Sequence, residues 1–236
     1  MKALNSSQAV QNARLQFELV DHFASYTDTQ TWTKTDGDAG ASVAIDADGT
    51  GGLMLLTTGA TDNNECYMET TNELFNFLDN RPINLQALVN FTESNTDDAN
   101  ILFGLMDAPG ANSIVDDGAG PKASYSGAVI YKVDGGTVWK FETSIAGDQV
   151  TSTSTTTAGG QDELLEIDVL PVSSTTVECV PKVNGQQLLD ATSGDPIRHT
   201  VTIASATQMA LVVGAKAGSA SSEVLTLKAV AATQKY

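Results

Sequence analysis

Basic residues are scarce in this chain. Among its 236 residues, 12 are Lys or Arg and 29 are Asp or Glu, so the formal net charge at pH 7 is −17. A protein that holds nucleic acid through its phosphates needs clustered Lys and Arg, and an anionic membrane surface attracts the same residues. The composition therefore predicts no nucleic-acid partner and no membrane partner.

Cysteine and histidine are also scarce, with two of each. Cys66 and Cys179 match no metal-binding or redox spacing, so we expect two free thiols in strands, with a single disulfide as the alternative. His22 and His199 each adjoin an apolar stretch, which favours structural roles. No Gly-x-Ser-x-Gly motif is present. The sequence thus excludes the familiar forms of nucleophilic catalysis.

Long hydrophobic runs and an export signal are missing too. The first twenty residues contain no apolar segment of the kind that a signal peptide has, and no run approaches the ~20 residues of a membrane span. We therefore expect the chain to fold inside the cell that makes it. Hydrophobic residues still make up 41% of the sequence, which is enough for a packed core.

What the sequence does contain is a series of short strands separated by turns rich in Gly, Asp and Ser. Residues 83–91 alternate apolar and polar side chains, which predicts a strand with one buried face. Residues 101–106 are apolar on both faces and predict a central strand. Within it, Gly104 indicates a bulge or the close approach of another backbone.

Three local signals supplement this pattern. Residues 72–78 predict a helical turn after the strand that begins near Cys66. Asn184 and Gly185 predict a two-residue hairpin loop, and Pro181 predicts that its strand lies at a sheet edge.

Strands at short, regular spacing with almost no helical periodicity predict an all-β fold. We expect a two-layer antiparallel sandwich of the jelly-roll type, which is concanavalin-like. Because no linker or change of charge divides the chain, residues 16–236 are predicted to form a single domain. Residues 1–15 form a short N-terminal arm, which either frays or becomes ordered against a partner.

The clearest hairpin signal lies around Asp134-Gly135-Gly136. A two-residue loop would leave Val129 opposite Lys140, whereas a three-residue loop gathers the large apolar side chains on one face. We therefore predict the three-residue loop. Its pairs are Tyr131 with Trp139, Val129 with Phe141 and Val133 with Thr137, with Lys132 and Lys140 on the other face.

Glu166-Ile167-Asp168-Val169 is similar to the catalytic strand of sandwich-fold glycoside hydrolases of the laminarinase type. A retaining mechanism needs two carboxyl groups about 5 Å apart. The position where the second glutamate belongs holds Leu170 or Pro171, and tryptophans that line a sugar cleft are few. We therefore predict no catalytic residues and no enzyme activity.

Aspartates beside glycines offer oxygen ligands for calcium at several turns, with Asp116 and Asp117 the best placed. No complete calcium-binding motif is present, however, and Asp-Gly is also the common composition of ordinary turns. We predict no cofactor and no bound metal, and Asp116-Asp117 is the place to look for one.

Four strings of the sequence resemble head proteins of tailed bacteriophages. They are TTGATDNNECYMET (57–70), NTDDANILFGLMDAPGAN (95–112), DDGAGPKASYSGAVIYKVDGGTVWKFET (116–143) and SATQMALVVGAKAGSASSE (205–223). The resemblance implies a capsid decoration (cement) protein, a jelly roll that clamps neighbouring subunits of the major capsid protein from outside, often as a trimer.

The main functional prediction is therefore a structural virion protein, made in the host cytoplasm and placed on the capsid exterior. Its expected partners are the major capsid protein and itself, as a homotrimer. The alternative is a carbohydrate-binding, lectin-like module for adhesion, in which loop aspartates and one exposed aromatic residue contact a glycan. The candidate contact residues for a capsid or subunit lie in the arm: Lys2, Leu4, Val10, Arg14 and Leu15.

Overall fold

The computed structural model describes residues 16–77, 81–203 and 207–235. These residues form eighteen β-strands and no helix, so none of the described segments is a helix that could cross a membrane. The predicted all-β fold is confirmed. The arm residues Lys2, Leu4, Val10, Arg14 and Leu15 lie outside the described residues.

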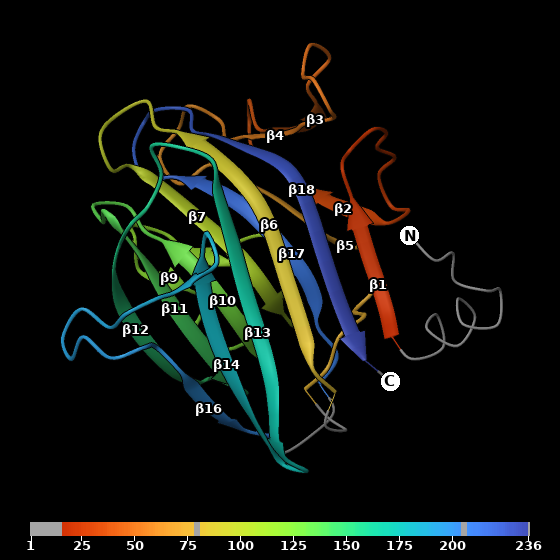
Figure 1. Ribbon diagram of the computed structural model, residues 1–236. Coiled ribbons are helices and arrows are strands. Elements are labelled where there is room, and N and C mark those ends of the chain that lie inside the picture. The colour runs from red at the N-terminus through yellow and green to blue at the C-terminus, as the bar shows by residue number, and fades with distance from the viewer. Residues whose placement is uncertain (1–15, 78–80, 204–206, 236) are drawn as a thin grey trace, which may run out of the picture.

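Two antiparallel sheets make the sandwich, and the larger one, sheet A, faces the viewer in Figure 1. Its strand order is β15-β14-β13-β6-β18-β4-β3, with β1 also paired to β18 and β16 also paired to β14. The bounds are β1 Gln16–Asp21, β3 Ser42–Ile45, β4 Met54–Thr57, β6 Ile83–Thr92, β13 Glu163–Ser173, β14 Thr176–Val183, β15 Gln186–Gln187, β16 His199–Thr202 and β18 Val224–Lys235.

Sheet B lies behind sheet A in Figure 1 and has the order β12-β11-β10-β7-β17-β5-β2. Its bounds are β2 Trp32–Thr35, β5 Glu65–Thr70, β7 Ala99–Met106, β10 Gly127–Lys132, β11 Val138–Ile145, β12 Asp148–Thr157 and β17 Ala210–Ala217. A separate pair, β8 Ile114–Val115 and β9 Gly120–Pro121, lies in the connection between β7 and β10.

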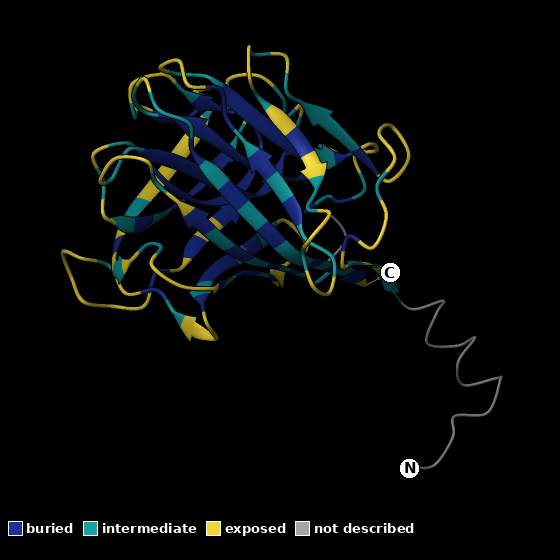
Figure 2. Cartoon of the chain, turned by 90° about the horizontal axis from the view of Figure 1, so that it is seen from above, coloured by how far each residue is buried: buried dark blue, intermediate teal, exposed yellow. Residues whose placement is uncertain are grey.

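The main core fills the space between the sheets, where the strands are mostly buried in Figure 2 while the loops carry most of the exposed residues. Strand β6 alternates buried and half-buried residues along nearly its whole length, as its sequence predicts. Trp139 lies in this core, edge-on to Phe91 with the ring centres 6.0 Å apart. Burial of this interdigitated apolar layer is the main source of stability.

A second core lies on the outer face of sheet B. Residues 107–126, which we call the cover segment, run across this face and bury apolar side chains beneath them. This cluster consists of Tyr67, Leu102, Met106, Ile114, Tyr125, Val129, Tyr131, Val133 and Val212. Strand β7 is therefore buried on both faces, as predicted. A Cβ on Gly104 would come within 2.1 Å of the Ala128 carbonyl oxygen, which confirms the predicted close approach.

The β10–β11 hairpin forms, but the predicted register of the three-residue loop is wrong, and the rejected two-residue loop does not form either. Val129 pairs with Glu142, Ile130 with Phe141 and Tyr131 with Lys140, one residue away from the predicted three-residue loop. Alternation selects a register only when one face is solvated. Here the two faces are both buried, one in the main core and the other under the cover segment.

The four residues predicted to form a single core face are all buried, but they divide between the two cores. Trp139 and Phe141 belong to the main core, whereas Val129 and Tyr131 belong to the cluster under the cover segment. Lys132, predicted to face outward, has a side chain that is only 1% exposed. Its Nζ lies 2.7 Å from the Glu93 carboxylate.

Three other local predictions have different outcomes. Residues 72–77 are not helical; instead Phe75 forms an isolated antiparallel bridge with Met209. The loop at Asn184-Gly185 has two residues, both with positive φ, as predicted. Strand β14 is not an edge strand, because β15 and β16 cover different parts of its outer side.

Pro181 lies between the parts of β14 that pair with β15 and β16, so its missing N–H removes no ladder bond there. Cys66 and Cys179 are free, fully buried and located in β5 and β14. Burial raises the pKa of the Cys66 thiol to about 12, and the same cause raises that of Cys179. Both thiols are therefore unreactive apolar groups of the core.

Candidate functional site

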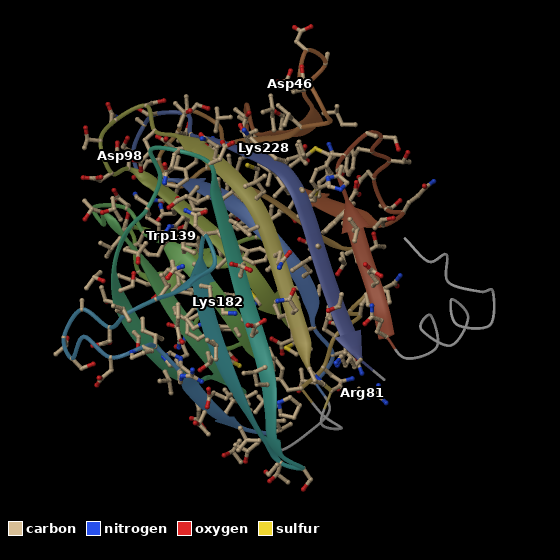
Figure 3. All side chains as sticks on the ribbon, in the orientation of Figure 1. Asp46, Arg81, Asp98, Trp139, Lys182 and Lys228 are labelled. Atoms are coloured by element: carbon tan, nitrogen blue, oxygen red, sulfur yellow. The ribbon has the colours of Figure 1, made fainter. Side chains whose placement is uncertain are left out.

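The hydrolase-like pair Glu166 and Asp168 lies on the outer face of sheet A. Glu166 Oε2 accepts a hydrogen bond of 2.8 Å from the Gly185 backbone N–H. Asp168 accepts bonds of 2.7 Å from Asn84 Nδ2 and 2.6 Å from Lys182 Nζ, the latter labelled in Figure 3. These neighbours come from β6 and the β14–β15 hairpin. The two carboxylates therefore connect adjacent strands and have no arrangement for general acid–base work.

The calcium candidates Asp116 and Asp117 turn toward different partners. Asp116 Oδ1 lies 2.5 Å from Lys216 Nζ, and Asp117 Oδ1 accepts a 3.3 Å hydrogen bond from Asn63 Nδ2. Over the described ranges, no three His, Cys, Asp or Glu side chains are grouped so that they could hold a metal ion. The cation beside Asp116 is the ammonium group of a lysine.

His199 has the structural role that the sequence predicts. Its two ring nitrogens lie 3.1 Å from Thr143 Oγ1 and 3.0 Å from Ser152 Oγ, and its ring packs against Phe141. Burial lowers the pKa of His199 to about 4, so the ring is neutral at pH 7. It joins β16 of sheet A to β11 and β12 of sheet B. His22, in contrast, is exposed.

His22 belongs to a groove of about 400 Å³ beside the free edge of sheet B, which we call the Tyr26 groove. It is formed by the end of β1, the loop of residues 22–31 and the start of β2. An aromatic side chain, Tyr26, lies among hydroxyl, amide and imidazole groups in this groove. The lining residues are Val20, Asp21, His22, Ala24, Ser25, Tyr26, Thr27, Gln30, Thr31 and Trp32.

Asp21 gives the loop its shape. Its Oδ1 accepts a 2.7 Å bond from the Phe23 N–H, and its Oδ2 accepts a 2.8 Å bond from Trp32 Nε1. Phe23 is fully buried despite a φ of 53°, and it packs with Trp32 at a ring-centre distance of 6.1 Å. The loop is therefore anchored in the core at both ends, and the groove above it is preformed.

The phenol group of Tyr26 is protonated and uncharged at neutral pH. Its hydroxyl donates to Asp28 Oδ1 at 3.4 Å, and burial together with the Asp28 charge raises its pKa. An aromatic face flanked by hydrogen-bonding side chains can stack on an apolar surface and orient a polar ligand. Among the described residues that line the groove, no nucleophile is hydrogen-bonded to a base.

A smaller hollow continues from the Tyr26 groove onto the outer face of sheet A. It has a volume of about 150 Å³ and shares Val20 and His22 with the groove. Leu88 and Leu164 line its apolar side, and the short side chains of β18 form its floor. A ligand longer than one ring therefore has an adjoining surface to occupy.

Glu69 on β5 is an unusual buried acid at the same edge of sheet B. Its Oε2 is buried without a hydrogen-bond partner among the described residues. Burial raises the pKa of Glu69 from 4.5 to about 7, although Lys122 of the cover segment counteracts part of that rise. The carboxyl group is therefore close to half protonated at neutral pH.

Two other hollows lack even a half-buried aromatic residue such as Tyr26. One, of about 360 Å³, lies between β16 and the β11–β12 pair and is lined by Asp148, four hydroxyl residues (Thr143, Ser144, Thr200 and Thr202) and three aliphatic side chains. The other is an open hollow of about 670 Å³ along the end of β6 and the β6–β7 loop. Its one aromatic residue, Phe91, is 7% exposed and belongs to the main core. The Tyr26 groove is thus the best candidate for a ligand site.

The fold has clear relatives among solved structures, although no protein-family profile and no curated sequence matches the chain. The carbohydrate recognition domain of Emp47p aligns over 91% of this chain and 93% of its own, with a TM-score of 0.59 and 10% identity. Peanut lectin aligns over 93% and 97%, with a TM-score of 0.57 and 11% identity. The endo-β-1,4-glucuronan lyase of Trichoderma reesei aligns over 92% and 94%, with a TM-score of 0.58 and 12% identity.

These similarities establish a concanavalin-like, legume-lectin-like sandwich. Sequence reasoning missed the Tyr26 groove, because Tyr26 is a single aromatic residue in a polar loop and His22 adjoins a strand. The available signal was the cluster His22-Phe23 to Tyr26 between two short strands. Nothing in that pattern shows that Phe23 turns inward while Tyr26 remains accessible.

Proposed function

We propose that this protein is a carbohydrate-binding, lectin-like module and that the Tyr26 groove holds the sugar. The observation that carries the proposal is the groove itself: a preformed hollow with one half-buried aromatic ring, that of Tyr26, among hydroxyl, amide and imidazole groups. A sugar ring presents a C–H face that packs on an aromatic ring and a rim of hydroxyls that pair with polar side chains. The carbohydrate recognition domains with the same fold add support to this assignment.

The charge of the protein favours a neutral or amino sugar as the ligand. The chain has a formal net charge of −17, and Asp21 and Asp28 lie at the groove. A uronate or sulfated sugar would be repelled by this field, whereas an uncharged or cationic sugar would not. The lyase relative acts on a glucuronan, but the described residues supply no acid–base constellation, and we propose no enzyme activity.

The test is binding of the purified full chain to a glycan array, followed by titration of the strongest neutral ligand. Tyr26→Ala is expected to weaken binding by roughly 5-fold to 30-fold, because truncating a central aromatic contact typically costs about 1–2 kcal/mol. Tyr26→Phe keeps the ring and should bind within about 3-fold of the wild type, since the Tyr26 hydroxyl forms only one long bond.

Val150→Ala is the matched control, because Val150 is 52% exposed on β12, at the opposite edge of sheet B from β2. It should leave affinity unchanged. If neither neutral nor amino sugars bind, or if Tyr26→Ala binds as well as the wild type, this site assignment fails.

The capsid-decoration role implied by the sequence resemblance is a second proposal. The four resembling strings contain the adjoining strands β11, β10, β7, β17 and β5, together with most of the cover segment. They therefore make one contiguous unit that includes five of the seven strands of sheet B, with β11 as far as Thr143, and that leaves out β2 and β12. In this proposal the partner is the major capsid protein, and the protein is a homotrimer on the virion exterior.

Co-sedimentation with capsids that lack the protein, together with light scattering, separates the two proposals. Saturable, stoichiometric binding that raises the heat resistance of the capsids supports decoration, and deletion of residues 1–15 then tests the arm. A monomer that ignores capsids but binds a sugar supports the lectin-like assignment.

A further inference from the structure

Two lysines of this acidic protein are buried. The side chains of Lys132 and Lys216 are each 1% exposed, although the sequence has only 12 basic residues. Lysine is almost never fully buried unless its charge is paired. Both lie near the end of the sandwich where Figure 3 labels Asp98, and each holds a loop against sheet B.

The surroundings of Lys132 are those expected for an ammonium group. Its Nζ donates to three oxygens: Glu93 Oε1 at 2.7 Å, the Asp97 carbonyl at 3.0 Å and the Ala99 carbonyl at 3.0 Å. An ammonium group has three protons, so three acceptors satisfy it. One carboxylate balances its charge.

The surroundings of Lys216 are different. Four oxygens lie around Nζ, and two of them belong to carboxylates. They are Asp116 Oδ1 at 2.5 Å, Asn112 Oδ1 at 2.8 Å, the Ile114 carbonyl at 3.1 Å and Glu65 Oε2 at 3.2 Å. Carboxylate, amide and backbone carbonyl oxygens in this combination form the ligand set that calcium prefers in proteins.

Three members of this oxygen shell, Glu65, Asn112 and Ile114, are also held by hydrogen bonds that do not involve the lysine, whereas the Asp116 side chain is 55% exposed. The three ligands from the cover segment occupy alternate positions, 112, 114 and 116, so the backbone curls around one point. Glu65 Oε1 accepts a 2.8 Å bond from the Asn112 N–H, and Tyr67 Oη accepts a 3.1 Å bond from the Ile114 N–H. Strand β5 therefore fixes the curl through its own side chains.

The charges of the shell also exceed what one ammonium group can balance. Glu65 and Asp116 carry two negative charges against one positive charge on Lys216, whereas a divalent cation would match them. Calcium coordinates oxygen at about 2.3–2.6 Å. The Asp116 oxygen already lies within that range of Nζ at 2.5 Å, whereas the Asn112, Ile114 and Glu65 oxygens, at 2.8, 3.1 and 3.2 Å, must move inward.

We infer that Glu65, Asn112, Ile114 and Asp116 form an oxygen shell suited to a divalent cation, and that in this protein the ammonium group of Lys216 occupies the cation's place. Lys216 reaches it from β17 and latches the cover segment onto sheet B without metal. Removing the ammonium group converts the latch into a calcium site. The inference is independent of the proposed function, because it concerns the cover segment whatever ligand the Tyr26 groove takes.

The test is Lys216→Ala in the full chain, with calcium alone as the probe, measured by thermal unfolding and by isothermal titration calorimetry. The wild type should melt at the same temperature in EDTA and in 10 mM calcium chloride. The variant should melt lower in EDTA, because the buried Glu65 carboxylate and the 55% exposed Asp116 carboxylate lose their cation. Calcium should bind it one to one with a Kd on the order of 10⁻⁴ M and raise its melting temperature by several degrees.

Two controls make the result specific to the shell. Adding Asp116→Asn to the variant should weaken calcium binding by about 10-fold or more, since one charged ligand is lost. Lys140→Ala removes a lysine from β11, outside the shell, and should confer no calcium response. A folded Lys216→Ala variant that ignores calcium overturns the inference, as does a wild type that binds calcium through Asp116.

If Lys216→Ala does not fold in EDTA, recovery of folded protein in calcium supports the inference. Lys216→Ser, whose hydroxyl tolerates water in the vacated channel, provides a second variant. If both variants fail to fold in calcium as well as in EDTA, the shell does not accept a metal ion and the inference is wrong.

Discussion

The outer faces of the two sheets are built differently. On sheet A, polar side chains form a solvated ladder between β6 and β13, in which Asn84 bonds to Asp168 and Asn90 to Asp162. On sheet B, the cover segment buries the corresponding face. Figure 2 shows the consequence as strands of mixed exposure beside strands that are buried throughout.

The difference between the two faces shows how the cover segment changes the surroundings of charged side chains on sheet B. On a solvated face, charged side chains keep their hydration and cost little free energy. Water also competes for their hydrogen-bond partners, so their positions are not fixed. On the covered face, two charged groups have several partners each: Glu142 accepts bonds from Tyr125, Gln149 and Thr151, and Lys216 reaches four oxygens. The cover segment thus provides the rigid surroundings that specific polar arrangements require.

The largest expected difference between the two faces is in the free energy of unfolding that is lost when a leucine is replaced by alanine. Leu102→Ala removes a fully buried side chain of the cluster under the cover segment, and the resulting cavity should lower the free energy of unfolding by about 2–5 kcal/mol. Leu164→Ala, on the partly open outer face of sheet A, should cost less than about 1 kcal/mol. Urea unfolding of both variants measures the difference, and equal losses would contradict the two-layer account.

A smaller effect, with a defined pH dependence, is expected at Glu69 on the covered sheet. Its folded-state pKa is raised from 4.5 to about 7, so its charged form destabilises the protein. The wild type should lose stability as the pH rises from about 4.5 through 7, and Glu69→Gln should remove that loss. The variant is expected to be about 1–2 kcal/mol more stable at pH 8 and equal to the wild type near pH 4.

The smallest effect, with the opposite sign, is expected at Asp162 on the solvated face. Lys228, labelled in Figure 3, lies 2.7 Å from its carboxylate, and this hydrogen bond with that of Asn90 lowers the pKa of Asp162 below 3.8. Its stabilisation is present above pH 3.8 and lost as the pH falls through the lowered pKa. Because its side chain is 48% exposed, Asp162→Asn should cost less than about 0.5 kcal/mol at pH 7, and less at high salt. A loss that does not shrink with salt argues against a solvated pair.

Much of the fold could be predicted because its signals are local. The alternation of residues 83–91, the doubly apolar strand around Gly104 and the turn at Asn184-Gly185 each depend on a period of two or on the φ angles that glycine and asparagine tolerate. All three are confirmed. The helical turn at residues 72–78 failed because Phe75 is drawn into a bridge with Met209, far away in the sequence.

The candidate site could be predicted only in part. The sequence predicts no bound metal and offers Asp116-Asp117 only as the place to look for calcium; the group that lies against Asp116 is the ammonium of Lys216, a hundred residues later in the chain. The Tyr26 groove depends on Phe23 entering the core and on Asp21 bonding to Trp32. Neither contact has a local sequence signature.

The sequence by itself determined that this protein is a β-sandwich, because strand periodicity and turn composition are properties of neighbouring residues. The tertiary structure decided the β10–β11 register, the burial of Lys132 and Lys216, and the course of the cover segment. Each of these depends on covering a sheet face with a distant part of the chain. The free energy of that contact depends on both segments together, so it cannot be predicted from the sequence of either segment alone.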